Sequence, residues 1–200
     1  MRLTMFVPAP PRRNEDQPST SVAIDPRTEQ ELRAFVGSNA NFYLRAWAPA
    51  LTGEGRITRV NFAAFFFPAF WLAYRKMYGA FFVLALILVV EYLLEFVVFT
   101  AILALGDPPW ATSILVGLIV AVVCGLCANR WYLSHVRRAI ARVRAEANAM
   151  RLDEGAYLRE LSIRGRTSIA APFLLTMSVG VGLVLIVGML DAFIFRGNLR

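Results

Sequence analysis

Two acidic side chains within an apolar run are the first candidates for chemistry in this sequence. Glu91 and Glu95 lie in residues 79–105, GAFFVLALILVVEYLLEFVVFTAILAL. Their i, i+4 spacing places both carboxylates on one face of a helix, where the charge of one makes ionisation of the other costly. Acids inside a membrane are typical of proton relays and cation sites. The alternative is structural: a polar contact to Tyr92, Thr100 or a neighbouring helix that orients the bundle.

Runs of aromatic residues that adjoin cations are the second candidate. Residues 70–78 read FWLAYRKMY, and residues 129–132 read NRWY. Aromatic rings favour the headgroup level of a bilayer, and the cations beside them can bind phosphates or lie over a ring face. The pattern fits simple anchoring, and it also fits a specific lipid-headgroup pocket or a docking surface for a protein partner. The residues that we expect at such a headgroup interface are Trp71, Tyr74, Arg75, Lys76, Arg130 and Trp131.

Catalytic and metal-binding chemistry has little support in the sequence. His135 is the single histidine, so no cluster of His and Cys ligands can form around a metal. Cys124 and Cys127 lie late in an apolar run, which lacks the polar, electropositive helix start that activates a thiol, and we interpret them as packing residues. The chain contains no phosphate-binding glycine loop and no G-x-S-x-G elbow. We therefore expect no catalytic residue, no metal, no cofactor and no enzymatic activity.

The composition is that of a membrane protein. The 200 residues are 58% hydrophobic and only 18% charged, where about 45–50% and about 25% are usual in soluble domains. A disordered chain, a nucleic-acid-binding globule and a disulfide-stapled secreted domain are excluded. The net charge is +7, and the basic residues flank the apolar runs rather than form a nucleic-acid patch. The expected partner is the lipid bilayer, with its anionic headgroups, together with a membrane-protein partner or a second copy of the chain.

Three apolar stretches are long enough to cross a bilayer as helices. They cover about residues 79–105, 108–129 and 167–190, and a membrane-spanning helix needs about 20 such residues. In the first stretch, eighteen Leu, Ile, Val and Phe residues favour insertion by about 5 to 11 kcal/mol, against a cost of about 5 to 7 kcal/mol for two central acids. The sequence therefore predicts an all-α integral membrane protein with three transmembrane helices.

Two further segments predict helices outside the hydrocarbon core. Residues 60–74 carry no charge, but they cover only about 22 Å as a helix and Pro68 interrupts them. We expect them to form a short interfacial or half-inserted helix. Residues 129–166 hold nine arginines against four acids, with apolar residues at helical spacing. They predict a basic amphipathic cytoplasmic helix with a break at Gly155.

The chain is expected to divide into three regions. Residues 1–34 form a mobile N-terminal tail rich in proline, serine and charge, although Asp25 indicates a weak helix start. Residues 35–58 form an amphipathic pre-membrane segment, which lies in the interface or packs on the rest of the protein. Residues 59–196 form the helical membrane domain.

The distribution of arginine predicts the orientation. Basic residues collect before the first span and after the second, whereas the turn GDPPW at residues 106–110 has none. By the positive-inside rule, we expect the N-terminus and residues 129–166 in the cytoplasm and the turn outside. The expected location is the bacterial inner membrane, in a multi-pass arrangement. Three spans place the C-terminus outside, although Arg196 and Arg200 argue mildly against this.

Three stretches resemble a bacterial membrane-protein family known as domain of unknown function 2628. They read FVGSNANFYLRAW, VNFAAFFFPAFWLAYRKMYGA and ANRWYLSHVRRAI, and the resemblance covers roughly residues 35–145. The second stretch is the most specific part, and the ANRWY element is the next. The resemblance implies a location and an architecture, but no activity and no catalytic residues.

Two classes of function remain open from the sequence. The first is a structural, interaction or lipid-contacting membrane subunit without catalytic activity. The alternative is a small proton- or cation-coupled transporter, or a channel-like protein, that uses Glu91 and Glu95. The sequence shows no internal repeat, which favours the first class because many transporters are built from repeated halves.

Overall fold

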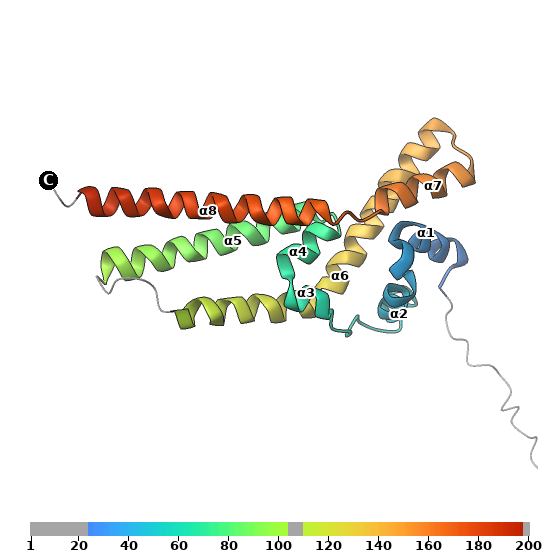
Figure 1. The fold of residues 1–200 in the computed structure, drawn as a ribbon. Helices are drawn as coiled ribbons and strands as arrows, with labels where there is room; N and C mark the ends of the chain where they lie inside the picture. The colour runs from blue at the N-terminus through green and yellow to red at the C-terminus, as the bar shows by residue number, and fades with distance from the viewer. Residues whose placement is uncertain (1–23, 104–109, 198–200) are drawn as a thin grey trace, which may run out of the picture.

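The computed structural model describes residues 24–103 and 110–197, and within these residues it contains helices and no strand (Figure 1). The predicted all-α class is confirmed. Three helices are long: α5, α6 and α8. In chain order, the elements are α1 Pro26–Val36, η1 Gly37–Asn39, α2 Ala40–Leu51, α3 Phe62–Phe66, α4 Pro68–Tyr74, α5 Tyr78–Phe96, η2 Val97–Ile102, α6 Trp110–Met150, α7 Glu154–Gly165 and α8 Ala170–Gly197.

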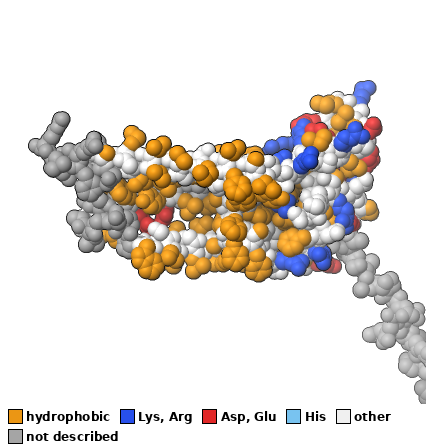
Figure 2. Space-filling view, in the orientation of Figure 1, with side chains coloured by type: hydrophobic (Ala, Val, Ile, Leu, Met, Phe, Trp, Pro, Cys, Tyr) orange, Lys and Arg blue, Asp and Glu red, His pale blue; other side chains and the backbone are white. Residues whose placement is uncertain are grey.

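The molecule consists of an apolar arm and a charged head. The arm comprises α5, η2, residues 110–129 of α6, and α8, which extend together away from the shorter helices (Figure 1). The head comprises α1, α2, α7 and residues 130–150 of α6. Hydrophobic side chains cover the visible face of the arm, whereas most charged side chains lie on the head (Figure 2). The two short helices α3 and α4 lie where the arm meets the head.

Three helices in the structure are long and apolar enough to cross a membrane. The three segments are Tyr78–Phe99, Trp110–Met150 and Glu154–Met189, with mean hydropathies of 2.6, 2.5 and 2.3 in their most apolar windows. They cover residues 79–99, 110–129 and 167–189 of the predicted spans, and residues 104–105 and 108–109 of those spans lie outside the described residues. Most of each apolar window is exposed in the isolated chain, as expected for surfaces that lipid would cover.

Helix α6 corrects the prediction of a separate basic helix. It runs without interruption from the charge-free residues 110–129 through the arginine-rich residues to Met150. Its 41 residues extend about 60 Å, twice the thickness of a hydrocarbon core. No glycine or proline lies between residues 126 and 150, so nothing ends the helix at the polar boundary.

The chain turns at residues 151–153, and not at Gly155 as predicted. Arg151 has a φ of 52°, in the left-handed region, and Asp153 then starts α7 by accepting a hydrogen bond from the backbone N–H of Ala156 at 2.7 Å. Gly155 lies in the first turn of α7. An effective N-cap therefore outweighs the cost of glycine within the helix.

The N-terminal tail predicted for residues 1–34 is too long, because it overlaps α1. Residues 1–23 lie outside the described residues, but residues 26–34 belong to α1 rather than to a tail. The predicted helix start is confirmed: the Asp25 carboxylate accepts hydrogen bonds from the backbone and side chain of Thr28, which hold the pKa of Asp25 below its usual value. Helix α1 is ordered because Leu32, Phe35 and Val36 are buried, and their burial offsets the entropy lost on ordering.

Residues 60–74 form two short helices and no span. Helix α3 ends at Phe66, and Pro68 begins α4 in the first helical position. Proline lacks an N–H and restricts the residue before it, so the break falls at Phe67. The predicted interruption at Pro68 is thus confirmed.

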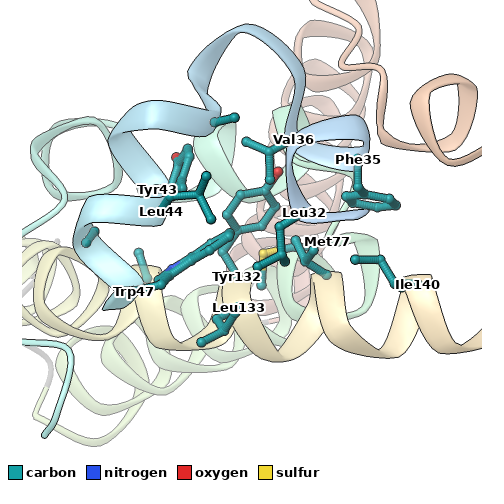
Figure 3. Close-up of a cluster of buried hydrophobic side chains, with 14 of the residues drawn as sticks. Leu32, Phe35, Val36, Tyr43, Leu44, Trp47, Met77, Tyr132, Leu133 and Ile140 are labelled. Atoms are coloured by element: carbon teal, nitrogen blue, oxygen red, sulfur yellow. The ribbon is translucent and has the colours of Figure 1, made fainter. Parts of the chain in front are cut away.

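The core of the head lies between α1, α2 and α6 (Figure 3). Trp47 is fully buried, so α2 packs on the protein, which settles one of the two alternatives for residues 35–58. Helix α7 approaches α1 so closely that a Cβ atom on Gly165 would lie 1.8 Å from the carbonyl oxygen of Phe35. The labelled core residues are Leu32, Phe35, Val36, Tyr43, Leu44, Trp47, Met77, Tyr132, Leu133 and Ile140.

Candidate functional site

Two buried asparagines join the arm to the head. Asn61 caps α3 by accepting a hydrogen bond from the backbone N–H of Ala64, and its side-chain amide donates to Oδ1 of Asn129 at 3.0 Å. Asn129 donates in turn to the backbone carbonyl of Arg59 at 2.8 Å. The indole N–H of Trp47 donates to the backbone carbonyl of Asn129 at 2.9 Å. This asparagine network fixes the loop before α3 against α6, because each group would otherwise be buried without a partner.

Arg75 is buried among tyrosine rings. Only 6% of the residue is exposed, and its guanidinium carbon lies 4.8 Å from the ring centroid of Tyr43, 5.0 Å from that of Tyr132 and 5.4 Å from that of Tyr74. A guanidinium group stays charged at any physiological pH, and cation–π contacts compensate part of the cost of burying it. Its Nη1 donates to the Tyr132 hydroxyl over a long 3.4 Å.

The charge of Arg75 has no acidic partner in the described part of the chain. None of the ion pairs there includes it, and its buried Nε has no hydrogen-bond partner. Its nearest ring neighbours are tyrosines, which bring no carboxylate to the site. Uncompensated buried charges are costly, and such a group is a candidate for binding an anion.

A cavity of about 960 Å³ opens beside Arg75. Residues of the loop before α3, of α2, of α3 and of α4 form its wall, and Ile169, just before α8, completes it. Two cations contribute to this wall, Arg59 and Arg75, and we call it the two-arginine cavity. The rest of the wall is mainly apolar and aromatic; its other residues are Asn39, Phe42, Tyr43, Val60, Asn61, Phe62, Ala63, Phe67, Phe70, Trp71 and Tyr74.

The predicted headgroup residues do not share one environment. Trp71 is 4% exposed and Arg75 is buried beside it, so neither lies on an open membrane surface, and simple anchoring is wrong for these two. Tyr74 is half-buried in the wall of the cavity. The burial has a common cause, since α4 packs against α6 with the rings of Trp71 and Tyr132 at 5.9 Å.

The other three predicted headgroup residues lie elsewhere. The ammonium group of Lys76 donates to the backbone carbonyl of Arg164 at 3.1 Å, near the C-terminus of α7, where a cation stabilises the helix end. Arg130 and Trp131 are exposed on α6, at the end of its charge-free stretch.

Glu91 and Glu95 lie within the arm, one helical turn apart on α5. An oxygen of Glu95 accepts a hydrogen bond from the hydroxyl of Ser113 on α6 at 3.3 Å. Glu91 is half-buried, and its Oε1 is buried without a hydrogen-bond partner among the described residues. Acidic side chains are visible within the apolar face of the arm (Figure 2). The structure thus connects one of the pair to a neighbouring helix, as the structural alternative requires.

A buried acid in the head was not found from the sequence. Glu31 is 3% exposed, and it accepts hydrogen bonds from the Tyr157 hydroxyl at 2.9 Å and from the guanidinium of Arg144. It therefore links α1 to α6 and α7. Within the described residues, no group of three or more His, Cys, Asp and Glu side chains could hold a metal ion, and both cysteines are free.

A comparison with known families identifies the central part of the chain. The sequence model described as protein of unknown function (DUF2628) matches residues 28–138. The chain belongs to this family. The DUF2628 segment extends from α1 into the head portion of α6, and it includes the asparagine network and every residue of the two-arginine cavity except Ile169. No curated protein and no solved structure matches the chain.

Proposed function

We propose that this chain is a non-catalytic, lipid-contacting subunit of the bacterial inner membrane. In this proposal the three long helices cross the bilayer, and the head lies on the cytoplasmic face against anionic headgroups. The observation that supports it best is the change of character along α6, where exposed arginines follow directly on a charge-free stretch in one unbroken helix. These arginines are Arg130, Arg137, Arg138 and Arg142.

The physical basis is electrostatic and hydrophobic together. Burying the arm in lipid would remove its exposed apolar side chains from water, at about 25 cal/mol per Å². Each arginine near an anionic surface adds about 1 kcal/mol of attraction. A rigid helix holds these charges at a fixed height above the hydrocarbon, because α6 continues from one region into the other.

The experiment tests lipid contact by the surface arginines. The purified protein is placed in nanodiscs that contain phosphatidylcholine and a small share of fluorescent phosphatidylglycerol, and energy transfer from the protein's tryptophans reports the local enrichment of the acidic lipid. We expect a triple variant, Arg137→Gln, Arg138→Gln and Arg142→Gln, to lose most of the enrichment. Arg159→Gln on α7 is the matched control. Equal enrichment in the triple variant and the wild type would contradict the proposal.

Membrane insertion has its own test. After cells are broken, we expect the protein in the membrane pellet, resistant to a carbonate wash and released by detergent. Recovery in the supernatant without detergent would overturn the proposed function as a whole. Cross-linking in intact membranes then shows whether a protein partner or a second copy lies against the arm.

The transporter alternative has one observation in its favour, the unpartnered oxygen of Glu91 between apolar helices. Proteoliposomes with an internal pH-sensitive dye decide between the two functions. Our proposal predicts proton flux no greater than that of empty vesicles, for the wild type and for the Glu91→Gln, Glu95→Gln variant alike. Flux that is present in the wild type and abolished in the variant would support transport instead.

A further inference from the structure

We propose that the two-arginine cavity binds one acidic phospholipid, with the lipid phosphate on Arg59 and Arg75 and an acyl chain along the phenylalanines of α3 and α4. The inference rests on the proposed membrane location, and it adds a specific site to the general lipid contact of the surface arginines. The site is built from the loop before α3, from α2 to α4, and from the residue before α8.

The charge of the cavity indicates an anion. Arg75 brings a buried guanidinium with no acidic partner among the described residues, and Arg59 brings an exposed one, 5.4 Å above the ring of Phe42. No Asp or Glu belongs to the wall. Arginine pairs bind phosphate oxygens through charge-assisted hydrogen bonds, and a bound phosphate would offset the cost of burying Arg75.

The remainder of the cavity indicates an apolar chain. Phe62 and Phe67 are 69% and 66% exposed, although both belong to the wall, so they leave apolar surface open to an occupant. Phe70 closes the side toward α8 by an edge-to-face contact with Phe173 at 5.1 Å. A free inorganic anion would leave this aromatic surface uncovered. An amphiphile would place its anionic group against the two arginines and its apolar chain against the phenylalanines.

The cavity also lies at the height where a headgroup is expected. Arg75 lies between α4 and the start of α5, Ile169 directly precedes α8, and Asn61 contacts Asn129 where the charge-free part of α6 ends. The apolar stretches of all three long helices therefore begin or end close to residues of this cavity. A lipid phosphate at this level would keep its chains in the hydrocarbon without deforming the bilayer.

The test uses the full chain in detergent micelles and a short-chain lipid. Dioctanoyl-phosphatidylglycerol, dioctanoyl-phosphatidylcholine and inorganic phosphate are titrated separately by isothermal calorimetry, and native mass spectrometry counts the bound lipids. We expect one phosphatidylglycerol per chain, with weaker binding of phosphatidylcholine and none of phosphate alone. Equal binding of both lipids would overturn the proposal. Binding of phosphate alone, as tight as that of phosphatidylglycerol, would identify a free-anion site and would also overturn it.

Variants locate the binding in the cavity. Arg59→Gln removes an exposed charge without touching the backbone carbonyl that Asn129 uses, and we expect a loss of affinity of about tenfold. Ala63→Trp fills the cavity from an exposed position and should abolish binding. Arg56→Gln is the matched control, because Arg56 is exposed on the same loop and does not belong to the wall. Unchanged affinity in both cavity variants would contradict the site.

Two readouts separate this inference from the proposed function. The melting temperature of each variant shows that it remains folded, and Arg75 is left intact in all of them. If the protein fractionates with membranes but binds no phosphatidylglycerol in the cavity, the inference alone fails. If it is recovered without detergent from the supernatant, the proposed function fails, whatever the micelle titration shows.

Discussion

At the scale of single residues, the Asn129 side chain makes two hydrogen bonds that stabilise the junction of arm and head. It is fully buried, donates to the Arg59 carbonyl and accepts from the Asn61 amide. Replacing it by alanine leaves both partners without a hydrogen bond, so we expect Asn129→Ala to reduce the free energy of unfolding by about 2–3 kcal/mol. Detergent-solubilised protein can be unfolded with denaturant while tryptophan fluorescence is recorded.

Asn148 provides the control for this prediction. It lies on the same helix and is exposed, so Asn148→Ala should change the free energy of unfolding by less than about 0.5 kcal/mol. Equal effects of the two substitutions would show that the asparagine network does not stabilise the junction.

Helix α1 carries two glutamates that differ in burial, Glu31 and Glu29, and they can be compared directly. Glu31 is buried against Arg144 and Tyr157, whereas Glu29 pairs with Arg33 on the surface at 2.7 Å. Arg144 is half-exposed and can be rehydrated when its partner is lost, which limits the cost. We expect Glu31→Gln to lower stability by about 1–2 kcal/mol and Glu29→Gln by no more than about 0.5 kcal/mol. Thermal melting followed by circular dichroism distinguishes them, and the reverse order would contradict the buried role.

The types of residue at the site could be predicted from the sequence, but their surroundings could not. Aromatic residues beside cations led to the prediction of Trp71, Tyr74 and Arg75 as headgroup residues, yet the pattern cannot show whether a run faces lipid or another helix. That depends on Tyr43 and Tyr132, which come from distant segments. Asn129 gave a weaker signal, a polar residue at the edge of an apolar run, and its partners again become visible only in the fold.

At the scale of elements, Gly165 determines how closely α7 can approach α1. A Cβ atom at this position would lie 1.8 Å from the Phe35 carbonyl oxygen, whereas one on Gly155 would meet the Asp153 carboxylate at 3.4 Å. Alanine normally stabilises a helix over glycine by about 1 kcal/mol. We expect Gly155→Ala to be neutral or stabilising, and Gly165→Ala to destabilise by about 2 kcal/mol or more because α1 must move.

Melting temperatures of the two alanine variants test this contrast. Both substitutions lie in α7 and add the same single methyl group. A higher melting temperature for Gly165→Ala than for the wild type would show that α1 does not pack on α7 as described.

Element existence was easier to predict than element ends. The apolar runs identified α5, the first half of α6 and α8 because their length alone distinguishes them. The continuation of α6 to Met150 was missed because a change from apolar to charged residues looks like a boundary, although the backbone needs a breaker in order to stop. Helix α1 was partly missed since its few apolar residues become a core only when α6 and α7 cover them.

At the scale of the whole molecule, the polar contacts that join the arm to the head lie close together. The asparagine network, the buried Arg75 and the cavity all lie where α6 passes from its charge-free residues into the head. A protein whose head moved freely relative to its arm would not need buried hydrogen bonds at this point. The hydrogen bonds of Trp47, Asn61 and Asn129 instead connect the head to the arm at this junction.

This geometry makes a specific prediction about sidedness. Helix α6 extends from the arm into the head (Figure 1). Trp110 and Met150 are its first and last residues, and both are exposed. In a background with Cys124→Ala and Cys127→Ala, single cysteines are introduced as Trp110→Cys or Met150→Cys. A membrane-impermeant maleimide is then added to intact spheroplasts.

Because the arginines of the head favour the cytoplasmic side, we expect Trp110→Cys to be labelled at once and Met150→Cys only after the membrane is permeabilised. Labelling of both in detergent shows that each thiol is reactive. Labelling of Met150→Cys in intact spheroplasts, with Trp110→Cys protected, would place the head outside. The exposed arginines would then face the leaflet away from the cytoplasm, and the positive-inside argument for this chain would be wrong.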